Sequence, residues 1–564
     1  MIHRRKHVKP YGISWDESNS SPTCTRIGQS NSAAAAQKLP DNLMVVQSKM
    51  KRCILSDAGI VNYYLDPNDS TLKENGDAAN IDGTDGQVMV EIPLFWYKYD
   101  YSGTEHSWLI SLEQFQGAKR HPAFYKNDAW VDHRYMGAYE GVLYDDSAAK
   151  YTNGVQQGAH NVGFVSGTRT IIHRTGTVKT VDMVGTASGT GYLVSDVLTL
   201  AGGTTGATVT VASIDGGGGV LTITLTTKGY GHSTGIVATS GGTGSGCTIN
   251  IATLETAMTN PYTKFEVGDK ITVSSSTSNN ATFTVSGTGD QSFTVNESVT
   301  DEDYDSNVVI TTQKDWTATT GDVLSSVSGK APINQGTRAN FRAAAKNRGT
   351  GWRQQDYDLI SAIQLLYVVE YASWYSQSVI GAGLTNFGGA SWATRNSYNP
   401  IESTGLSNNI GNASGGVDNG AGGLGSYMTY RGIENFFGHI WKWVDGFNIN
   451  GGIPYVSNTD TDFADNTTTN YTRLEDIGGS GITLPQGSND YQSTLEQIDR
   501  GFLPSALGGG ASTYITDYYY QSAGWRVAKL GGAATYGGQA GFFCWYLANS
   551  SSYASSTIGG RVCF

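Results

Sequence analysis

The sequence is poor in charged residues and in proline, and it has no long apolar run. Asp, Glu, Lys and Arg make up 15% of the 564 residues, and 12 prolines stand beside 73 glycines. Low charge together with many Gly, Thr, Ser and Tyr residues favours short strands and turns over long solvated helices. No stretch approaches the roughly 18 apolar residues that a membrane-spanning helix needs, so we expect no membrane insertion.

Cysteine and positive charge are also scarce. The net charge of -12 argues against a nucleic-acid partner, because phosphate binding requires a basic surface. A basic head, MIHRRKHVKP, is followed by YGISWDESNSS and not by an apolar core, so we expect no signal peptide. The cysteines are odd in number, widely spaced and without a C-x-x-C pair, which predicts buried free thiols and neither disulfides nor a zinc site. They are Cys24, Cys53, Cys247, Cys544 and Cys563.

The C-terminal segment lacks acidic side chains, basic side chains and histidine. Between Leu530 and Gly560 there is no Asp, Glu, His, Lys or Arg, whereas a catalytic site needs a nucleophile beside a base or a pair of carboxylates. After the run Tyr518, Tyr519 and Tyr520, large aromatic residues alternate here with Asn, Ser, Gln and Gly. This mixture is typical of antibody binding loops, where Tyr and Trp give stiff contact area and small polar residues give adaptable hydrogen bonds. We therefore predict a binding protein with no catalytic residues, no cofactor and no metal.

Two other segments predict local features. The apolar spacing of YDLISAIQLLYVVEY predicts a buried amphipathic helix, capped at its start by Asp356 or Asp358. Upstream, the segment HPAFYKNDAWVDHRYMGAYEGVL carries a dense set of aromatic residues, and the last of them, Tyr139, is followed by Glu140. The acidic run from 301 to 305, DEDYD, has carboxylates for calcium but lacks the glycine and final glutamate of a calcium loop, so a solvated turn is favoured.

A resemblance rests on the segment YRGIENFFGHIWKWVDGF. It resembles the G-M-E-x-x-x-G-N-V-W-E-W motif of the formylglycine-generating-enzyme-like branch of the C-type lectin fold, while His439 and Lys442 differ from the motif. The matching residues are Gly432, Glu434, Gly438, Trp441 and Trp443. YMGAYEGVL is similar to an early strand of that family, and the terminal IGGRVCF to its closing G-F-R. Together these pieces resemble the variable proteins of diversity-generating retroelements, which include phage major tropism determinants and tail receptor-binding proteins of Bacteroides phages.

The resemblance implies an α+β protein, a C-type-lectin-like domain interrupted by inserted all-β modules. It divides the chain into an N-terminal tail-attachment segment (1–45), a first part of the lectin-like region (46–163), a β module with two similar halves (164–256), a second β module (257–318), and the main part of the lectin-like domain with a variable C-terminal region (319–564). The two halves are read from Gly191-Tyr192, which recurs at Gly229-Tyr230.

In this family, mutagenesis directed by a template repeat diversifies exposed positions near the C-terminus. Carried over to this chain, the displayed receptor-binding set is Thr535, Tyr536, Gln539, Phe542, Trp545, Tyr546, Asn549, Ser550, Ser552 and Tyr553. Alternation in FFCWYL places about half of its residues in the core, which leaves Phe542, Trp545 and Tyr546 at the surface if Phe543, Cys544 and Leu547 point inward. We expect Trp441 and Trp443 to be scaffold, and Glu434 to accept hydrogen bonds from a buried loop.

The implied function is host recognition by a virion protein. It would sit at the tip of a phage tail fibre, be made in the host cytoplasm, form a homotrimer with other tail proteins as neighbours, and bind a bacterial surface receptor, either a glycan or an outer-membrane protein. The enzyme branch uses a cysteine pair near its C-terminus, and GWRVAKLGGAATY has none. Two alternatives stay open, a purely structural fibre or baseplate subunit and a tail-spike depolymerase. The latter would draw its carboxylates from Asp356, Asp358, Asp445 and Glu475.

Overall fold

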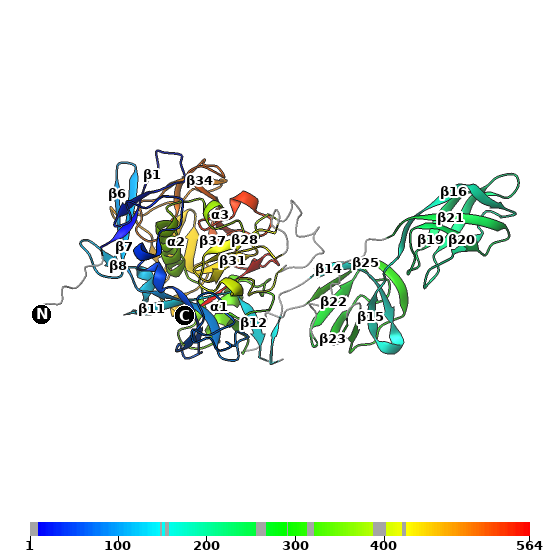
Figure 1. Ribbon diagram of the computed structural model, residues 1–564, viewed down its shortest axis with the longest axis horizontal. Helices are drawn as coiled ribbons and strands as arrows, with labels where there is room; N and C mark the ends of the chain where they lie inside the picture. Colours follow the sequence, from blue (N-terminus) through cyan, green and yellow to red (C-terminus); the bar gives the residue numbers. More distant parts are fainter. Residues whose placement is uncertain are drawn as a thin grey trace. The chain divides into compact units, whose positions relative to one another are not determined.

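The computed structural model describes residues 9–146, 149–152, 157–254, 267–289, 292–312, 321–386, 402–419 and 425–564. The chain is a mostly-β protein with few helices and several antiparallel sheets (Figure 1). It forms two compact units: a main unit from the described parts of 1–155, 315–392 and 399–564, and a second unit from those of 156–314. The expected α+β class is met only in part, because α-helix in the described ranges is confined to α1 (Arg338–Lys346), α2 (Tyr357–Tyr371) and α3 (Ser376–Val379). None of these helices could cross a membrane.

Two sheets of the main unit bring together segments that are far apart in the sequence. The first has the order β2 (Thr25–Gly28), β1 (Tyr11–Asp16), β7 (Glu105–Ser111), β6 (Trp96–Ser102) and β8 (Lys119–Arg120). The second has the order β27 (Arg353–Gln354), β40 (Val562–Cys563), β11 (His133–Gly137), β5 (Gln87–Pro93), β3 (Lys51–Leu55) and β4 (Val61–Tyr64). The predicted attachment segment therefore contributes two strands to the main unit, with Tyr11, Ile13 and Trp15 buried in its core.

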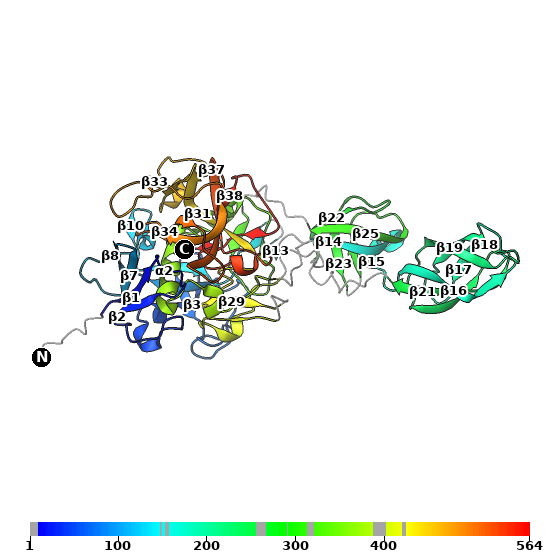
Figure 2. The ribbon, with the colours of Figure 1, turned by 90° about the horizontal axis from the view of Figure 1, so that it is seen from above.

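The largest sheet has nine strands and carries the C-terminal segment. Its order is β33 (Thr472–Arg473), β32 (Ile453–Val456), β31 (Trp441–Asn450), β37 (Trp525–Leu530), β38 (Trp545–Asn549), β36 (Ile515–Gln521), β34 (Asn489–Leu495) and β35 (Pro504–Leu507), with β39 (Ile558–Gly559) beside β31. Figure 2 shows β31, β37 and β38 side by side. All pairs are antiparallel except β36 with β38 and β31 with β39.

Smaller elements complete the main unit. The short strands are β9 (Tyr125–Lys126), β10 (Ala129–Trp130), β12 (Val142–Asp145), β13 (Lys150–Thr152), β26 (Val323–Ser325), β28 (Gly415–Val417), β29 (Tyr427–Tyr430) and β30 (Ile433–Glu434). The 3-10 turns are η1 (Asp41–Leu43), η2 (Gln47–Lys49), η3 (Pro122–Phe124), η6 (Asn408–Ile410), η7 (Asp460–Asp462) and η8 (Gly537–Gln539).

Helix α2 lies in the centre of the main unit. Asp356 caps it by accepting a hydrogen bond from the Leu359 amide at 2.9 Å, and it ends where Ala372 takes a left-handed conformation with φ 51°. The predicted helix and its aspartate cap are confirmed. Every residue of the helix is buried, so the helix is not amphipathic as predicted. The helix can be enclosed on all sides because its charged residues Asp358 and Glu370 form ion pairs with Arg500 and Arg431. It therefore anchors the elements that surround it, among them β1 and β31.

The second unit contains a closed barrel and a six-stranded sheet. The barrel runs β14 (Gln157–Val165), β15 (Thr170–His173), β24 (Ser292–Val295), β23 (Thr282–Thr288), β22 (Lys270–Ser274) and β25 (Glu302–Thr312), and η4 spans Ser166–Thr168. The sheet runs β16 (Val178–Thr190), β21 (Ser245–Leu254), β20 (Gly235–Ser240), β17 (Val197–Leu200), β18 (Thr208–Ile214) and β19 (Val220–Thr227). The barrel thus takes strands from both sides of residues 178–254, a nesting that the predicted order of modules does not contain.

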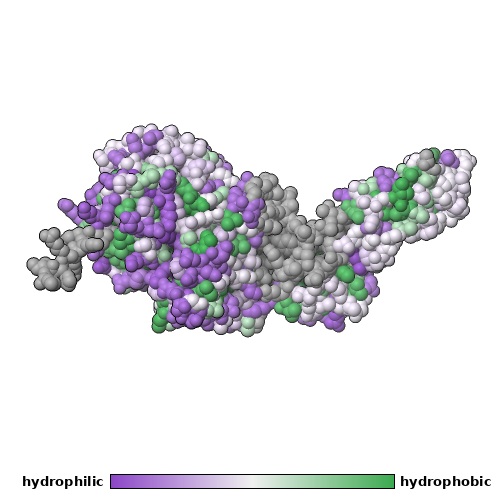
Figure 3. Space-filling view, in the orientation of Figure 1, coloured by the Kyte–Doolittle hydropathy of each residue, from purple (hydrophilic) through white to green (hydrophobic). Residues whose placement is uncertain are grey.

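The six-stranded sheet is built from two similar stretches. β17 pairs with β18 and β20 pairs with β21, each antiparallel, and β16 and β19 add one strand before each pair. Figure 3 shows much of the surface of this sheet as near-neutral in hydropathy, as its Gly and Thr content leads one to expect. The five cysteines of the chain are free and buried, which confirms that prediction.

Candidate functional site

One face of the nine-stranded sheet carries a group of tyrosines. Along β36, Tyr519 points into the core, while its neighbours Tyr518 and Tyr520 point the other way and are half-buried. The strand register places Tyr520 beside Tyr546 of β38 and Tyr518 beside Tyr491 of β34. With two loop residues, these form what we call the tyrosine face: Tyr491, Tyr518, Tyr520, Tyr536, Tyr546 and Tyr553.

Ring contacts hold the tyrosine face together. Tyr520 and Tyr546 have ring centroids 5.1 Å apart, and those of Tyr491 and Tyr518 lie 5.4 Å apart, both in edge-to-face geometry. The Trp441 ring lies 4.8 Å from that of Tyr536 and 5.5 Å from that of Tyr546. Such pairs restrict side-chain motion beyond what burial alone does. The tyrosines therefore form a stiff surface before any partner arrives.

A lysine lies beneath this surface. The Lys529 ammonium is 4.2 Å from the Tyr546 ring centre, 4.6 Å from that of Trp441 and 5.9 Å from that of Tyr553. Burial lowers the pKa of Lys529 to about 7, against a smaller opposing effect of Cys544. The aromatic faces are the main stabilising surroundings of this cation. Lys529 thus ties the loop that holds Tyr553 to strands β37 and β38.

The ten predicted receptor-binding residues divide by exposure. Eight lie at or near the surface: Thr535, Ser550, Ser552 and Tyr553 are exposed, and Tyr536, Gln539, Tyr546 and Asn549 are half-buried. They come from η8 and its flanking turn, from β38 and from the loop that follows it. Three of these eight, Tyr536, Tyr546 and Tyr553, belong to the tyrosine face, and the other five are near neighbours of these three in the sequence. Tyr553, at 42% exposure, is the most exposed large residue of the set.

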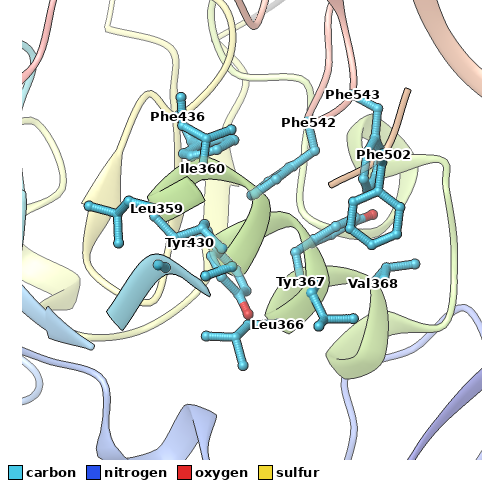
Figure 4. Packing of buried hydrophobic residues seen from close by; sticks show 14 of the residues in the cluster. Leu359, Ile360, Leu366, Tyr367, Val368, Tyr430, Phe436, Phe502, Phe542 and Phe543 are labelled. Atoms are coloured by element: carbon cyan, nitrogen blue, oxygen red, sulfur yellow. The ribbon is translucent and has the colours of Figure 1, made fainter. Parts of the chain in front are cut away.

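The other two, Phe542 and Trp545, are buried, so the expectation that they are exposed is wrong. They are 0% and 1% exposed. Phe542 stacks on Tyr367 of α2 with ring centroids 4.2 Å apart and on Phe436 at 4.4 Å, and Figure 4 shows Phe542 and Phe543 directed toward the helix. Strand alternation does not apply to Phe542 and Phe543, because both residues precede β38 and lie in a turn. Trp545 packs its ring 5.9 Å from Tyr357 on the same core.

Asp517 fixes the turn that contains this pair. Its carboxylate accepts a hydrogen bond from the Phe543 amide at 2.7 Å, and a Cβ added to Gly541 would lie 2.1 Å from Asp517 Oδ1. The carboxyl group is fully buried, and this burial raises its pKa to about 8 despite the Phe543 amide and the Thr516 hydroxyl. At neutral pH the group is therefore mostly protonated in the folded protein.

This protonation predicts a pH dependence of stability. Between the ordinary pKa of Asp and about 8, the folded chain holds a proton that the unfolded chain has lost, so stability falls as pH rises through this window. Asp517→Asn, which mimics the protonated form, should match the wild type near pH 4. At pH 8 it should be more stable, by at most about 5 kcal/mol over these four pH units. Urea unfolding of both proteins at pH 4, 6 and 8 measures this; a difference that stays constant with pH would contradict it.

Buried polar contacts support the scaffold around the resemblance motif. Glu434 accepts hydrogen bonds from the Gly405 and Ser407 amides at 2.9 and 2.7 Å, which confirms its predicted role under a loop. Trp441 and Trp443 are buried, as expected for scaffold residues. The two residues that differ from the motif both contact Glu140: His439 Nδ1 lies 2.5 Å from Glu140 Oε2, and Lys442 Nζ lies 2.9 Å from Oε1. Burial raises the pKa of Glu140, but the contacts with His439 and Lys442 hold it below its ordinary value, at about 2.

Of the four carboxylates considered for a depolymerase, three are paired with an arginine and one lies apart from them. Asp356 lies 2.6 Å from Arg134, Asp358 is held by Arg500, and Asp445 by Arg342, all in buried ion pairs. Glu475 is exposed on the surface outside this cluster. Burial raises the pKa of Asp356, but Arg134 and Arg353 hold it below its ordinary value, so this carboxyl group is ionised and does not serve as a general acid.

The acidic run at 301 to 305 is engaged within the barrel. Asp301 accepts hydrogen bonds from the Ser166 amide and hydroxyl, and Glu302 from the Ser276 hydroxyl and the Asn279 side chain. Strand β25 begins at Glu302, so the favoured solvated turn is wrong from that residue on; the side chains of 303 to 305 lie outside the described residues. Among described residues, no group of three or more His, Cys, Asp or Glu is placed to hold a metal ion.

The sequence reasoning missed Tyr491, Tyr518, Tyr520 and Lys529. The run of three tyrosines in β36 carried a signal, because alternation places the outer two on one face and the middle one on the other. Tyr491 and Lys529 gave no such signal, since only the register of β34 and β37 brings them to this face. No protein-family model matches the chain, and no curated protein matches its sequence.

Proposed function

We propose that the chain is a receptor-binding protein of a phage tail-fibre tip, which attaches to a bacterial surface without catalysing a reaction. The observation that carries this proposal is the tyrosine face, which includes three of the predicted residues that lie at the surface, Tyr536, Tyr546 and Tyr553. Tyrosine-rich, weakly charged surfaces give contact area at small entropic cost and are enriched in binding hot spots. The surface is also stiff, because its rings pack on one another and over Lys529.

The proposal also covers the fold of the main unit and the way in which its surface residues are varied. The main unit is a C-type-lectin-like domain of the formylglycine-generating-enzyme-like branch, supported by the buried Trp441 and Trp443 and by Glu434 holding its loop. A retroelement diversifies codons for the surface residues of 535–553. A reverse-transcriptase gene and a template repeat beside this gene would test that part; a locus without them would count against it.

Symmetric assembly strengthens weak single contacts. A homotrimer at a fibre tip presents three tyrosine faces, and effective concentration then raises avidity by about 100-fold or more over one site. The second unit serves as a spacer that sets reach and stiffness. The receptor itself is a surface glycan or an outer-membrane protein.

Binding of the purified full chain to bacteria tests the proposed function. Fluorescently labelled protein is titrated onto a panel of Bacteroides strains and other bacteria, and excess unlabelled protein is added as competitor. We expect saturable, competable binding to a subset of strains and no release of new reducing ends from their capsules. Absence of saturable binding to every strain, or release of sugar fragments by the protein, would overturn the proposal.

A further inference from the structure

A cavity of about 670 Å³ lies in the main unit, where β6, β8 and the hairpin β9–β10 meet. Aromatic side chains from three elements form its walls: Trp96, Tyr97, Tyr125 and Trp130. The polar residues around it are Lys119, Arg120, Asn458, Asp499 and Arg500. A site of this size, with apolar walls and a few polar groups, is typical of small-ligand binding. It is lined by none of the residues of the tyrosine face.

Two tryptophans and an arginine form a layered stack at this cavity. The Arg120 guanidinium lies 5.4 Å from the Trp96 ring centre and 5.3 Å from that of Trp130. Trp130 is 45% exposed, and its ring is 5.2 Å from that of Tyr125. Trp130 thus joins Trp96 and Tyr125 in a continuous aromatic wall that reaches the surface, and contiguous apolar surface of this kind marks binding sites.

The hairpin that presents Trp130 is held rigidly. Its two turn residues, Asn127 and Asp128, both have positive φ, as the tightest hairpin turns require. The Asn127 side chain donates to Asp460 at 3.0 Å and accepts from Arg353 at 2.9 Å, which fixes the turn to the rest of the main unit. The wall of the cavity is therefore preformed, and a ligand would lose little entropy in ordering it.

The charges around the cavity leave one cation uncompensated. Arg500 forms two hydrogen bonds with Asp358, and Lys119 pairs with Asp499. Arg120 is exposed, has no carboxylate partner among the described residues and lies over the two tryptophan rings. Tyr97 is 1% exposed, and its hydroxyl makes no hydrogen bond with any described residue. The site thus offers aromatic walls, a planar cationic fork and a buried hydroxyl.

We propose that this cavity binds an acidic sugar unit of a surface glycan, with its pyranose ring against Trp130 and its carboxylate on Arg120. The C–H groups on one face of a pyranose form an apolar surface that packs on aromatic rings. The arginine fork matches a carboxylate in geometry and charge. The inference goes beyond the proposed receptor contact, because it concerns a separate site with its own ligand chemistry.

Titration of the full chain with oligosaccharides tests this site. The probes are uronate- and sialate-bearing oligosaccharides, each beside a neutral counterpart of the same length, with binding followed by calorimetry. We expect wild-type protein to bind at least one acidic probe about tenfold or more tightly than its neutral counterpart. Arg120→Ala and Trp130→Ala should each weaken that binding by about tenfold or more, while Arg473→Ala, an exposed arginine on β33, should leave it unchanged.

Three results would overturn the proposal. The wild type would fail to bind any acidic probe at millimolar concentration, it would bind acidic and neutral probes equally, or Arg120→Ala would bind as the wild type does. A Trp130→Ala protein that changes its oligomeric state without affecting sugar binding would assign the cavity to contact between copies of the chain. The triple variant Tyr520→Ala/Tyr546→Ala/Tyr553→Ala should keep acidic-sugar binding, so failure of this site and failure of the tyrosine face are separable.

Discussion

The triple variant Tyr520→Ala/Tyr546→Ala/Tyr553→Ala should lose cell binding by about 100-fold or more while its main unit stays folded. Truncating a hot-spot tyrosine costs about 2 kcal/mol of binding free energy, and each 1.4 kcal/mol is a factor of ten. The three rings are half-buried or exposed, so their loss removes little core volume. Titration of labelled protein onto a binding strain gives the affinity, and thermal unfolding gives the stability.

A matched control comes from the same sheet. Tyr455 on β32 is half-buried and lies outside the tyrosine face, so Tyr455→Ala should bind cells as the wild type does. Wild-type affinity in the triple variant would show that the contact surface lies elsewhere. Equal losses in the triple variant and in Tyr455→Ala would point to a general effect on the sheet.

Phe542→Ala should destabilise the main unit by about 3–5 kcal/mol, the usual cost of removing a fully buried phenylalanine. The ring is enclosed by Tyr367, Phe436 and Tyr430, and the cavity left behind adds to the lost burial. Urea unfolding followed by tryptophan fluorescence measures the change, with Tyr553→Ala as a surface control that should cost under about 1 kcal/mol.

The conservative variant Phe542→Leu distinguishes a structural role of this side chain from a role in receptor contact. Phe542→Leu keeps most of the apolar volume, so it should retain cell binding at temperatures where it is folded. Loss of binding in a stably folded Phe542→Leu protein would mean that this ring touches the receptor. That result would contradict its burial against α2.

Local patterns in the sequence predicted local structure well. The capped helix α2 followed from apolar spacing with an aspartate before it, and Glu434, Trp441 and Trp443 have the scaffold roles that we expected from the residues themselves. The predictions failed where contacts between distant segments decide whether a residue is buried. Phe542 and Trp545 look like surface residues in a polar, Gly-rich segment, but a turn before β38 directs Phe542 into the core.

Pairing between strands that are far apart in the sequence could not be predicted from local sequence patterns. β11 lies between β5 and β40, so Met136 pairs with Val90 and with Cys563, more than 400 residues away. The same kind of pairing joins Tyr491 to the tyrosine face and brings Arg120 between Trp96 and Trp130. The aromatic residues of 121–143 were visible in the sequence, but nothing there indicated which of them would line a cavity and which would fill the core.

Oxidative footprinting of the chain while it is bound to cells tests the central claim most directly. Hydroxyl radicals modify exposed tyrosines, and mass spectrometry compares each residue in the free and the cell-bound protein. We predict strong protection of Tyr520, Tyr546 and Tyr553 on cells and unchanged modification of Tyr455. Bound protein whose three tyrosines react as fast as in free solution would contradict the assignment of this face to the receptor.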